Sequence, residues 1–419
     1  MERSGRAEII SIGDELLIGQ VVNTNASWMA EQLSLAGIVL NRITAIGDKE
    51  IDIFQAIDEA LKRVQVVFIT GGLGPTSDDI TKPALCKYFN TELIFNQEAF
   101  NQASELFARR GYAMTERNRE QAMLPAVCEP IRNNLGTAPG MWFEKEGGFI
   151  VSMPGVPFEM KAMFVAEVIP KLKRCVWTQN LVHKTLMTTG VGESVLADRI
   201  LNWEVELPDN FKLAYLPQPG LVRLRLSGHG MDSLSLNLEL KRLTNELAGL
   251  LNEYVYGFDD ESLESIVGKM LGAGRKTLAI AESCTGGAIS AMITSVPGSS
   301  AYFMGSVVAY SNEIKHKILG VDNQLILQYG AVSREVVEAM SKGARETFAV
   351  DYALATSGIA GPDGGTQEKP VGTIWISLAS AAETISVCHT FGEHRDRNIR
   401  RSTLAALNML RLELLSDSV

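Results

Sequence analysis

Features that mark large classes of protein are missing from this sequence. It has no CxxC pair, and its cysteines stand far apart, at Cys86, Cys128, Cys175, Cys284 and Cys388. This spacing suits neither a zinc site nor a redox pair, so we expect reduced thiols. No run approaches the roughly 18 consecutive apolar residues of a membrane-spanning helix. The N-terminus also lacks the charged, apolar and small-residue succession of a secretory signal. We therefore expect a cytoplasmic protein with no membrane partner.

Positive charge is scarce as well. Lys and Arg number 39 against 49 Asp and Glu, which gives a formal net charge of −10. Because duplex binding needs a basic surface that neutralises phosphates, we expect no nucleic-acid partner. A local exception is HRDRNIRR, residues 394–401, which is large enough to hold one small phosphate. The alternative for this run is a solvated basic helix face.

The remaining composition is that of an ordinary globular protein, with 46% hydrophobic and 21% charged residues. A chain of 419 residues exceeds the roughly 250 to 300 residues that one hydrophobic core supports, so the sequence predicts several domains. Strand-like and amphipathic helical runs alternate in both its first and its last part, a pattern typical of mainly parallel sheets covered by helices. We expect an α/β fold, in which two α/β domains, residues 1–175 and 259–419, are joined by a small α+β linker module over 176–258.

The first domain carries a candidate phosphate site after the strand VVFITGG. Gly72 and Gly74 let a backbone approach an anion closely, and the sequence predicts a helix that begins near Asp79 and presents free N–H groups. Thr76 and Ser77 supply hydroxyl groups beside this turn. The alternative is a glycine turn that serves only as loop punctuation.

Two pairs of carboxylates accompany this turn: Asp78 and Asp79 beside it, and Asp14 and Glu15 after the first predicted strand. Because adjacent parallel strands end at the same edge of a sheet, we expect both pairs at one rim. Hard oxygen ligands near a phosphate suit a divalent cation. Taken singly, Asp78 or Asp79 is also a candidate helix N-cap.

In the last domain, LAIAESCTGG places Ser283 at a predicted strand end, before glycines that open a helix. A nucleophile there is exposed at the ligand-binding edge of the sheet, and backbone N–H groups can face an oxyanion. Cys284 is the rival nucleophile. Alternation puts Cys284 on the strand face of Leu278 and Ile280, which favours Ser283. Lys315 is a candidate base, since a desolvated lysine can deprotonate serine; the alternative is a solvated surface lysine.

Other residues complete this second constellation. Tyr310 ends the strand that precedes Lys315, and Ser300 in GSSAYF is either a proton shuttle or a helix cap. The stretch TSGIAGPDGGTQEKPVGT crowds glycines and hydroxyl groups after a buried strand, where a loop can approach a ligand closely. The substrate contacts expected in this domain are Thr285, Gly286, Ser300, Thr356, Ser357, Gly358, Gly361, Arg395 and Arg397.

These motifs resemble those of the CinA family. SIGDELLIGQVVNTNASWMAEQL, GGLGPTSDDITKPAL, NREQAMLP, NNLGTAPGMWF and MPGVPFEM are similar to its molybdopterin-binding-like domain. AESCTGG, YSNEIKHKILGV, YGAVS, TSGIAGPDGGTQEKPVGT and the GEHRDR run resemble its nicotinamide mononucleotide deamidase domain. The two resemblances cover residues 7–171 and 263–415.

For the last domain, the resemblance implies an amidase that needs no cofactor and converts nicotinamide mononucleotide to nicotinic acid mononucleotide and ammonia. We expect Ser283 to attack the carboxamide carbon and Lys315 to accept its proton. Tyr310 would set or relay that proton, and backbone N–H groups near Gly286 or Ser357 would stabilise the oxyanion.

For the first domain, the resemblance implies hydrolysis of ADP-ribose to AMP and ribose 5-phosphate, with a divalent metal (cobalt or magnesium) and potassium. The implied metal or acidic groups are Asp14, Glu15, Asp78 and Asp79. The implied substrate contacts are Asn23, Asn25, Gly72, Gly74, Thr76, Ser77, Gly136, Thr137, Pro154 and Gly155, with Asn133 helping to close the pocket.

Alternatives remain open at this point. A domain of this fold can bind a nucleotide or molybdopterin without hydrolysing it, and the whole chain can be a competence-related binding protein. The resemblance implies small-molecule nucleotide partners and a homodimer. The sequence does not fix the preferred metal or whether the two sites communicate.

Overall fold

The computed structural model describes residues 5–76, 78–111, 114–176, 180–230 and 232–417. The chain forms two compact units, the first comprising Met1–Val182 and His229–Leu236, and the second comprising His183–Gly228 and Asn237–Val419.

The first unit is built on a six-stranded sheet in the order β2-β1-β3-β8-β7-β6. Its first four strands in this order are parallel, and β7 and β6 continue the sheet in the antiparallel sense. The central strand β3 is buried at every residue, as expected of a parallel strand covered on both faces. The strands are β1 (Arg6–Ile12), β2 (Val39–Ile46), β3 (Val66–Thr70), β6 (Glu129–Ile131), β7 (Gly140–Lys145) and β8 (Gly148–Met153).

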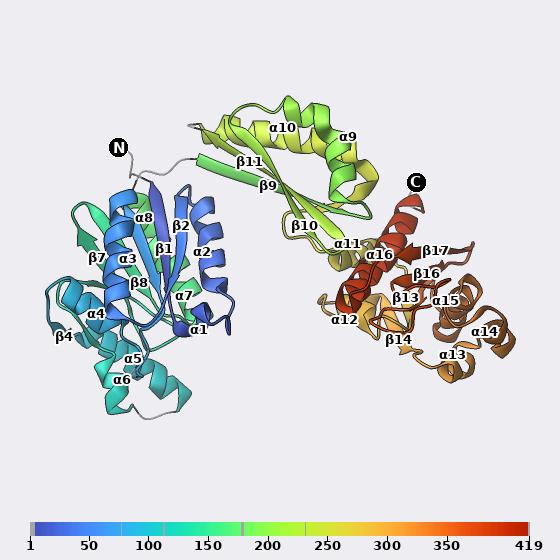
Figure 1. Ribbon diagram of the computed structural model, residues 1–419, viewed down its shortest axis with the longest axis horizontal. Helices are drawn as coiled ribbons and strands as arrows, with labels where there is room; N and C mark the ends of the chain where they lie inside the picture. Colours follow the sequence, from blue (N-terminus) through green and yellow to red (C-terminus); the bar gives the residue numbers. More distant parts are fainter. Residues whose placement is uncertain (1–4, 77, 112–113, 177–179, 231, 418–419) are drawn as a thin grey trace. The chain divides into compact units, whose positions relative to one another are not determined.

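Helices cover both faces of this sheet and form two separate cores (Figure 1). One core packs the apolar sides of α2 (Thr24–Leu35), α7 (Pro157–Met163) and α8 (Ile169–Cys175) on the sheet, and the other packs α3 (Glu50–Arg63) and α4 (Thr81–Tyr88). The remaining elements are α1 (Asp14–Leu17), α5 (Gln97–Arg110), α6 (Glu116–Glu120), the π-helical turn Phe164–Val168, and a small antiparallel pair, β4 (Leu93–Phe95) and β5 (Met123–Pro125).

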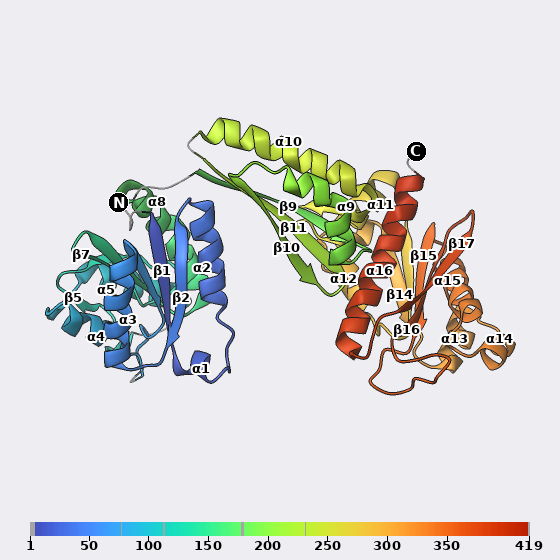
Figure 2. The same cartoon turned by 45° about the horizontal axis from the view of Figure 1, so that its top comes forward.

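The larger sheet of the second unit has the order β14-β13-β15-β16-β17. Its first three strands in this order are parallel, and the last two are antiparallel. Figure 2 shows α16 on one side of this sheet and α13, α14 and α15 on the other. The elements are α11 (Leu263–Gly274), β13 (Leu278–Glu282), α12 (Ala288–Thr294), the 3-10 turn Ser299–Ala301, β14 (Phe303–Val308), α13 (Asn312–Leu319), α14 (Asn323–Tyr329), α15 (Arg334–Phe348), β15 (Tyr352–Gly358), β16 (Thr373–Ala379), β17 (Thr384–Thr390) and α16 (Arg395–Ser416).

A four-stranded sheet of order β10-β11-β9-β12 precedes this domain in sequence. Met187, Leu221 and Tyr256 belong to the same apolar cluster as Leu263, so this sheet shares a core with the domain that follows. The buried guanidinium of Arg411 in α16 also donates hydrogen bonds to carbonyls of residues 253 and 255. The elements are β9 (Asn180–Thr189), α9 (Glu193–Val205), β10 (Phe211–Gln218), β11 (Leu221–Gly230), α10 (Ser233–Leu251), the 3-10 turn Asn252–Tyr254 and β12 (Val255–Phe258).

The predicted α/β fold class with parallel strands is confirmed by these sheets. The sequence pattern did not reveal the antiparallel strands at the edge of each large sheet, because they follow one another without an intervening helix. Within the described residues, none of the helices combines the length and the apolar character needed to cross a membrane.

One glycine controls how α13 packs on α15. A Cβ atom on Gly343 would lie 1.8 Å from the carbonyl oxygen of Leu319, at the end of α13. We expect Gly343→Ala to destabilise the second unit by about 1 to 3 kcal/mol, because backbone has to move. Gly272→Ala in α11 is the matched control, since a Cβ there meets nothing within 4 Å and alanine favours a helix. Urea unfolding of both variants measures the difference, and equal midpoints would contradict the expected clash.

Candidate functional site

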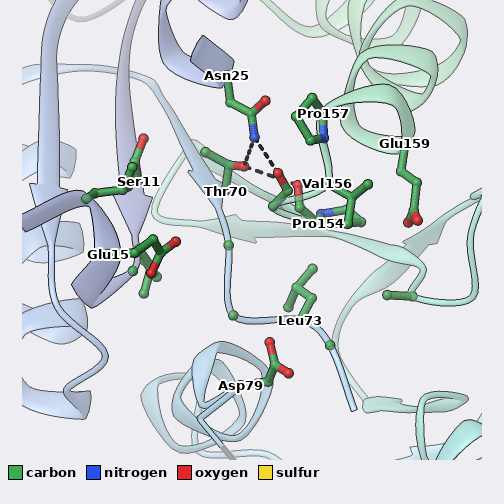
Figure 3. A pocket seen from close by; sticks show the side chains of 18 of the residues that line it. Ser11, Glu15, Asn25, Thr70, Leu73, Asp79, Pro154, Val156, Pro157 and Glu159 are labelled. Atoms are coloured by element: carbon green, nitrogen blue, oxygen red, sulfur yellow. Dashed lines mark hydrogen bonds between the residues drawn. The ribbon is translucent and has the colours of Figure 1, made fainter. Parts of the chain in front are cut away.

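A pocket of about 440 Å³ lies at the carboxyl ends of β1, β3 and β8 (Figure 3). The strand ends, the start of α2 and the loop 154–157 form its walls. Ser77 lies outside the described residues, and Thr76 and Gly136 do not line the pocket. The predicted contacts that do line it are Asn23, Asn25, Gly72, Gly74, Thr137, Pro154 and Gly155.

The two predicted asparagines, Asn23 and Asn25, hold the walls of the pocket in place by hydrogen bonds. Asn23 caps α2 by accepting from the N–H of Ala26 at 3.1 Å, and its amide donates to the Ser11 hydroxyl at 2.9 Å. The amide of Asn25 donates to the carbonyl of Gly155 at 2.7 Å. Thr70 at the end of β3 holds the same loop by donating to the Pro154 carbonyl at 3.1 Å. The pocket therefore has a preformed rim.

The glycine-rich turn is packed against its own helix. A Cβ on Gly72 would lie 2.2 Å from the Thr81 hydroxyl oxygen, and one on Gly74 would lie 2.5 Å from a carboxylate oxygen of Asp79. Thr76 donates both its N–H, at 2.9 Å, and its hydroxyl, at 2.5 Å, to the carboxylate of Asp79. In this structure Thr76 and Asp79 therefore bond to each other, and their predicted roles on phosphate and metal stay predictions.

The predicted metal site is not assembled. Glu15, Asp78 and Asp79 line the pocket, but Asp14 does not, since its carboxylate accepts from the N–H of Asp48 at 3.3 Å. Among the residues that the structure describes, no three His, Cys, Asp or Glu side chains lie close enough to hold a metal ion. The divalent-cation site stays a prediction.

Asp48 also lines this pocket, although it belongs to none of the sequence motifs. Its carboxylate accepts from the N–H of Asp14 at 3.0 Å. Burial raises the pKa of Asp48, and the nearby negative charges of Asp14, Glu15 and Asp78 raise it further. The rim therefore concentrates negative charge at the ends of β1 and β2.

The second site lies at the carboxyl end of β13. Lys315 in α13 donates from Nζ to the Ser283 hydroxyl oxygen at 3.1 Å and to the Ala309 carbonyl at 2.8 Å. Only 1% of Lys315 is exposed, and burial lowers its pKa. No ion pair to Lys315 is present in the described part of the chain. The structure thus brings together the predicted nucleophile and a lysine with no counter-charge.

Cys284 belongs to the apolar core cluster that includes Leu278, Ile280 and residues of α16. It is 6% exposed, and burial raises the pKa of its thiol to about 12. A thiol in that state carries almost no thiolate near neutral pH. The geometry favours Ser283 over Cys284.

The turn after Ser283 is fixed by the carboxylate of Glu282, which is fully buried. It accepts from the N–H groups of Gly287 at 2.9 Å, Ile289 at 3.1 Å and Ser290 at 2.9 Å. The N–H of Gly286 donates to the Ser283 carbonyl at 3.1 Å, so of the N–H groups near Gly286 predicted to face an oxyanion, this one is already paired. In the described chain, no carbonyl acceptor is paired with the backbone N–H of residue 284 or 285.

The hydroxyl-bearing residues beside Ser283 form its scaffold. Thr285 and Thr356 are buried and share a hydrogen bond of 2.8 Å between their hydroxyl oxygens. The N–H of Ser283 donates to the Thr356 carbonyl at 3.0 Å. The Ser357 hydroxyl donates to the Ala331 carbonyl at 2.6 Å, which ties β15 to the loop before α15.

Tyr310 does not contact the reactive pair. It is 63% exposed, and its hydroxyl oxygen accepts from Arg395 at 3.3 Å. Arg395 also donates to the carbonyl of Gly361 at 2.8 Å. No hydrogen bond joins Tyr310 to Ser283 or Lys315 in the described structure, so the predicted proton relay through Tyr310 is not supported.

The remaining predictions for this domain have mixed outcomes. Ser300 is misassigned: Leu278, the first residue of β13, pairs with Phe303, so Ser300 lies at the opposite sheet edge from Ser283. Arg397 is exposed in the first turn of α16. Gly358 ends β15, where a Cβ would lie 2.6 Å from the Ile374 side chain.

The chain matches three family descriptions in succession. They are "Probable molybdopterin binding domain" at residues 8–174, "Damage-inducible protein CinA KH domain" at 183–257 and "CinA C-terminal domain" at 260–414. It is 46% identical over 408 residues to a CinA-like protein of Cytophaga hutchinsonii, covering 97% of this chain and 98% of that protein. The chain belongs to the CinA family.

Other CinA relatives extend the same comparison. A CinA-like protein of Flavobacterium psychrophilum is 43% identical over 416 residues, covering 98% of this chain and 99% of that protein. The crystal structure of the competence/damage inducible protein CihA from Agrobacterium tumefaciens is 32% identical with a TM-score of 0.36, covering 36% of this chain and 93% of that chain.

Sequence reasoning missed several residues of this CinA chain that shape the two sites. Glu282 carried a usable signal, because it shares the strand face of Leu278 and Ile280, and a carboxylate at an apolar position needs buried donors. Glu159 and Asn398 carried none, since each has a partner distant in sequence: Asn133 donates to Glu159, and Asn398 donates to the carbonyl of Ala360.

Thiol labelling tests the burial of Cys284. We expect iodoacetamide at pH 8 to modify the exposed Cys175 first and to reach Cys284 only after unfolding, because the buried thiol has a pKa of about 12. Peptide mass spectrometry of native and urea-treated protein measures this. Modification of native Cys284 as fast as Cys175 would contradict the assignment.

Proposed function

We propose that the second unit hydrolyses a carboxamide through Ser283 and Lys315, with nicotinamide mononucleotide as the substrate. The observation that carries the proposal is the buried Lys315 amine 3.1 Å from the Ser283 hydroxyl oxygen. An ammonium group excluded from water without a counter-ion is disfavoured, so the neutral amine that can accept a proton is more populated than in a solvated lysine. This is the requirement for a serine activated by lysine.

The proposed reaction has two steps, the acylation of Ser283 and the hydrolysis of the resulting ester. The Ser283 oxygen forms a bond to the carboxamide carbon while its proton passes to the Lys315 amine. The C–N bond then breaks, and that proton leaves with the nitrogen as ammonia. Water attacks the resulting ester, Lys315 takes its proton, and the proton returns to the Ser283 oxygen as the carboxylic acid departs.

Charge that develops on the carbonyl oxygen needs donors. The N–H groups of residues 284 and 285 are the available candidates, since Gly286 and the first turn of α12 are already paired. Arg395 is the candidate for the substrate phosphate. Tyr310 follows β14, whose end pairs with the end of β13, so its partner Arg395 lies at the same sheet edge as Ser283.

Substitution of the reactive pair tests the scheme. We expect Ser283→Ala and Lys315→Met each to lower kcat by about 10³-fold or more, because the nucleophile or its base is lost. Cys284→Ala is the matched control and should retain most activity. Ammonia release from nicotinamide mononucleotide measures all three. A Ser283→Ala enzyme near the wild-type rate would exclude the scheme.

The pH dependence provides a separate test. Lys315 works only when neutral, so kcat/KM should rise with pH through its pKa in the free enzyme. Because burial lowers that pKa from 10.5, the half-maximal point should fall below 10.5. A rate profile that keeps rising with a midpoint at or above 10.5 would contradict a buried lysine base.

We further propose that the pocket of the first unit takes ADP-ribose and releases AMP and ribose 5-phosphate. Its volume of about 440 Å³ is in the range of small-molecule sites, and it lies where open α/β sheets bind ligands. The divalent cation stays part of the proposal, and we assign no step to it.

Asn25→Leu tests this second assignment. The loss of its hydrogen bond to the Gly155 carbonyl should loosen the loop 154–157 and lower kcat/KM for AMP release by about tenfold. Ammonia release in the same preparation should be unchanged, which controls for folding of the second unit. AMP release is measured with and without added Mg²⁺ or Co²⁺. A wild-type enzyme that releases no AMP under any of these conditions would refute the activity.

A further inference from the structure

Glu159 is a carboxylate that lines the pocket of the first unit and has no role in either proposed reaction. It is the third residue of α7, where an acidic side chain commonly caps the helix. No side-chain hydrogen bond caps α7, however. The carboxylate instead accepts from the amide of Asn133 at 2.7 Å. In Figure 3, Glu159 lies on the α7 side of the pocket, apart from Glu15 and Asp79.

Neighbouring residues fix the position of the Glu159 carboxylate. Asn133 is buried, and its side-chain oxygen accepts from the N–H groups of Leu135 at 3.1 Å and Gly136 at 2.8 Å. Its amide nitrogen must therefore face outward, toward the Ala138 carbonyl and Glu159. A Cβ on Gly136 would lie 2.0 Å from the Glu159 carboxylate, so a larger residue at position 136 would displace the carboxylate from this place.

The carboxylate has unused capacity. A carboxylate has about four lone-pair positions, and Asn133 fills one of them. None of the ion pairs formed by the described residues includes Glu159. Within the described residues, Glu159 also belongs to no group of three or more His, Cys, Asp or Glu side chains that could hold a metal ion. The remaining positions suit N–H or O–H donors of a ligand.

The rest of the pocket indicates which part of a nucleotide lies here. Gly71, Gly72 and Gly74 line the pocket and let the backbone of the turn 71–74 approach an anion closely, so we place the diphosphate at this turn. Val156, on the same loop that leads into α7, lines the pocket and is 41% exposed, which provides an apolar surface for a base. The sugar between base and phosphates then faces Glu159, and its vicinal hydroxyls are donors of the kind that carboxylates bind in dinucleotide sites.

We propose that Glu159 binds the ribose hydroxyls of the adenosine half of the nucleotide, and so makes the first unit selective for ribonucleotides. This rests on the proposed nucleotide-binding function of that unit. Glu159 acts here as a specificity determinant, and Asn133 and Gly136 position it.

Calorimetric binding of ADP and of 2′,3′-dideoxy-ADP to the full chain tests the proposal. We expect the wild-type protein to bind ADP about tenfold or more tightly than the dideoxy compound, because the latter leaves the carboxylate unpaired. Glu159→Ala should lower that ratio toward one, mainly by weakening ADP. Glu167→Ala is the matched control, since Glu167 is exposed and does not line the pocket. It should keep the wild-type ratio.

The outcomes separate the two claims. If ADP and ADP-ribose both fail to bind the wild-type protein, the proposed nucleotide-binding function of the pocket is wrong, and the proposed role of Glu159 is wrong as well. If both nucleotides bind but the wild-type protein does not prefer ADP over its dideoxy form, or Glu159→Ala keeps the preference, only the role of Glu159 is overturned. Should Glu159→Ala not fold, Glu159→Gln replaces it, since its amide oxygen still accepts from Asn133 while the charge is lost.

Discussion

The chemistry assigned to the second unit depends on keeping water away from one amine. Lys315 reaches Ser283 from α13, and its only recorded partners within the described residues are neutral oxygens, of Ser283 and Ala309. Desolvation of an ion costs several kcal/mol unless an opposite charge compensates. The packing of α13 on α15, where Gly343 allows close approach, therefore helps to keep water from Lys315 in the proposed reaction.

The same principle explains the opposite treatment of Glu282. This carboxylate is as buried as Lys315, but it is surrounded by donors at the start of α12. Those bonds hold the turn that presents Ser283, and they remove the helix N-terminus from the list of oxyanion donors. Two consecutive residues at the end of β13 thus have different roles. Glu282 fixes the backbone on one face of the sheet, and the Ser283 hydroxyl contacts Lys315 on the other.

Much of the fold followed from the sequence because hydrophobic periodicity is local. The runs ending in Thr70 and Glu282 were recognisable as buried strands, and strand ends gave both site locations. Alternation along β13 also separated Ser283 from Cys284. These inferences needed only nearest-neighbour geometry.

The site features that could not be predicted from the sequence depend on contacts between residues that are far apart in the chain or on the conformation of loops. Whether Thr76 faces a ligand or Asp79, and whether Tyr310 faces Lys315 or Arg395, depends on loop conformation. Ser300 was misplaced because a glycine-serine run does not reveal which edge of the sheet it occupies. The carboxylates predicted to share a metal lie at the same end of the sheet. Among the residues that the structure describes, however, they do not come close enough together to form a group that could hold a metal ion.

The most direct test of the central claim is the ionisation of Lys315 itself, observed by ¹⁵N NMR of the lysine side chains and assigned by its absence in Lys315→Arg. The account predicts that the Lys315 Nζ resonance titrates below the ordinary lysine value of 10.5. A Lys315 resonance that titrates at or above 10.5 would contradict it, since an amine that stays charged cannot take the proton of Ser283.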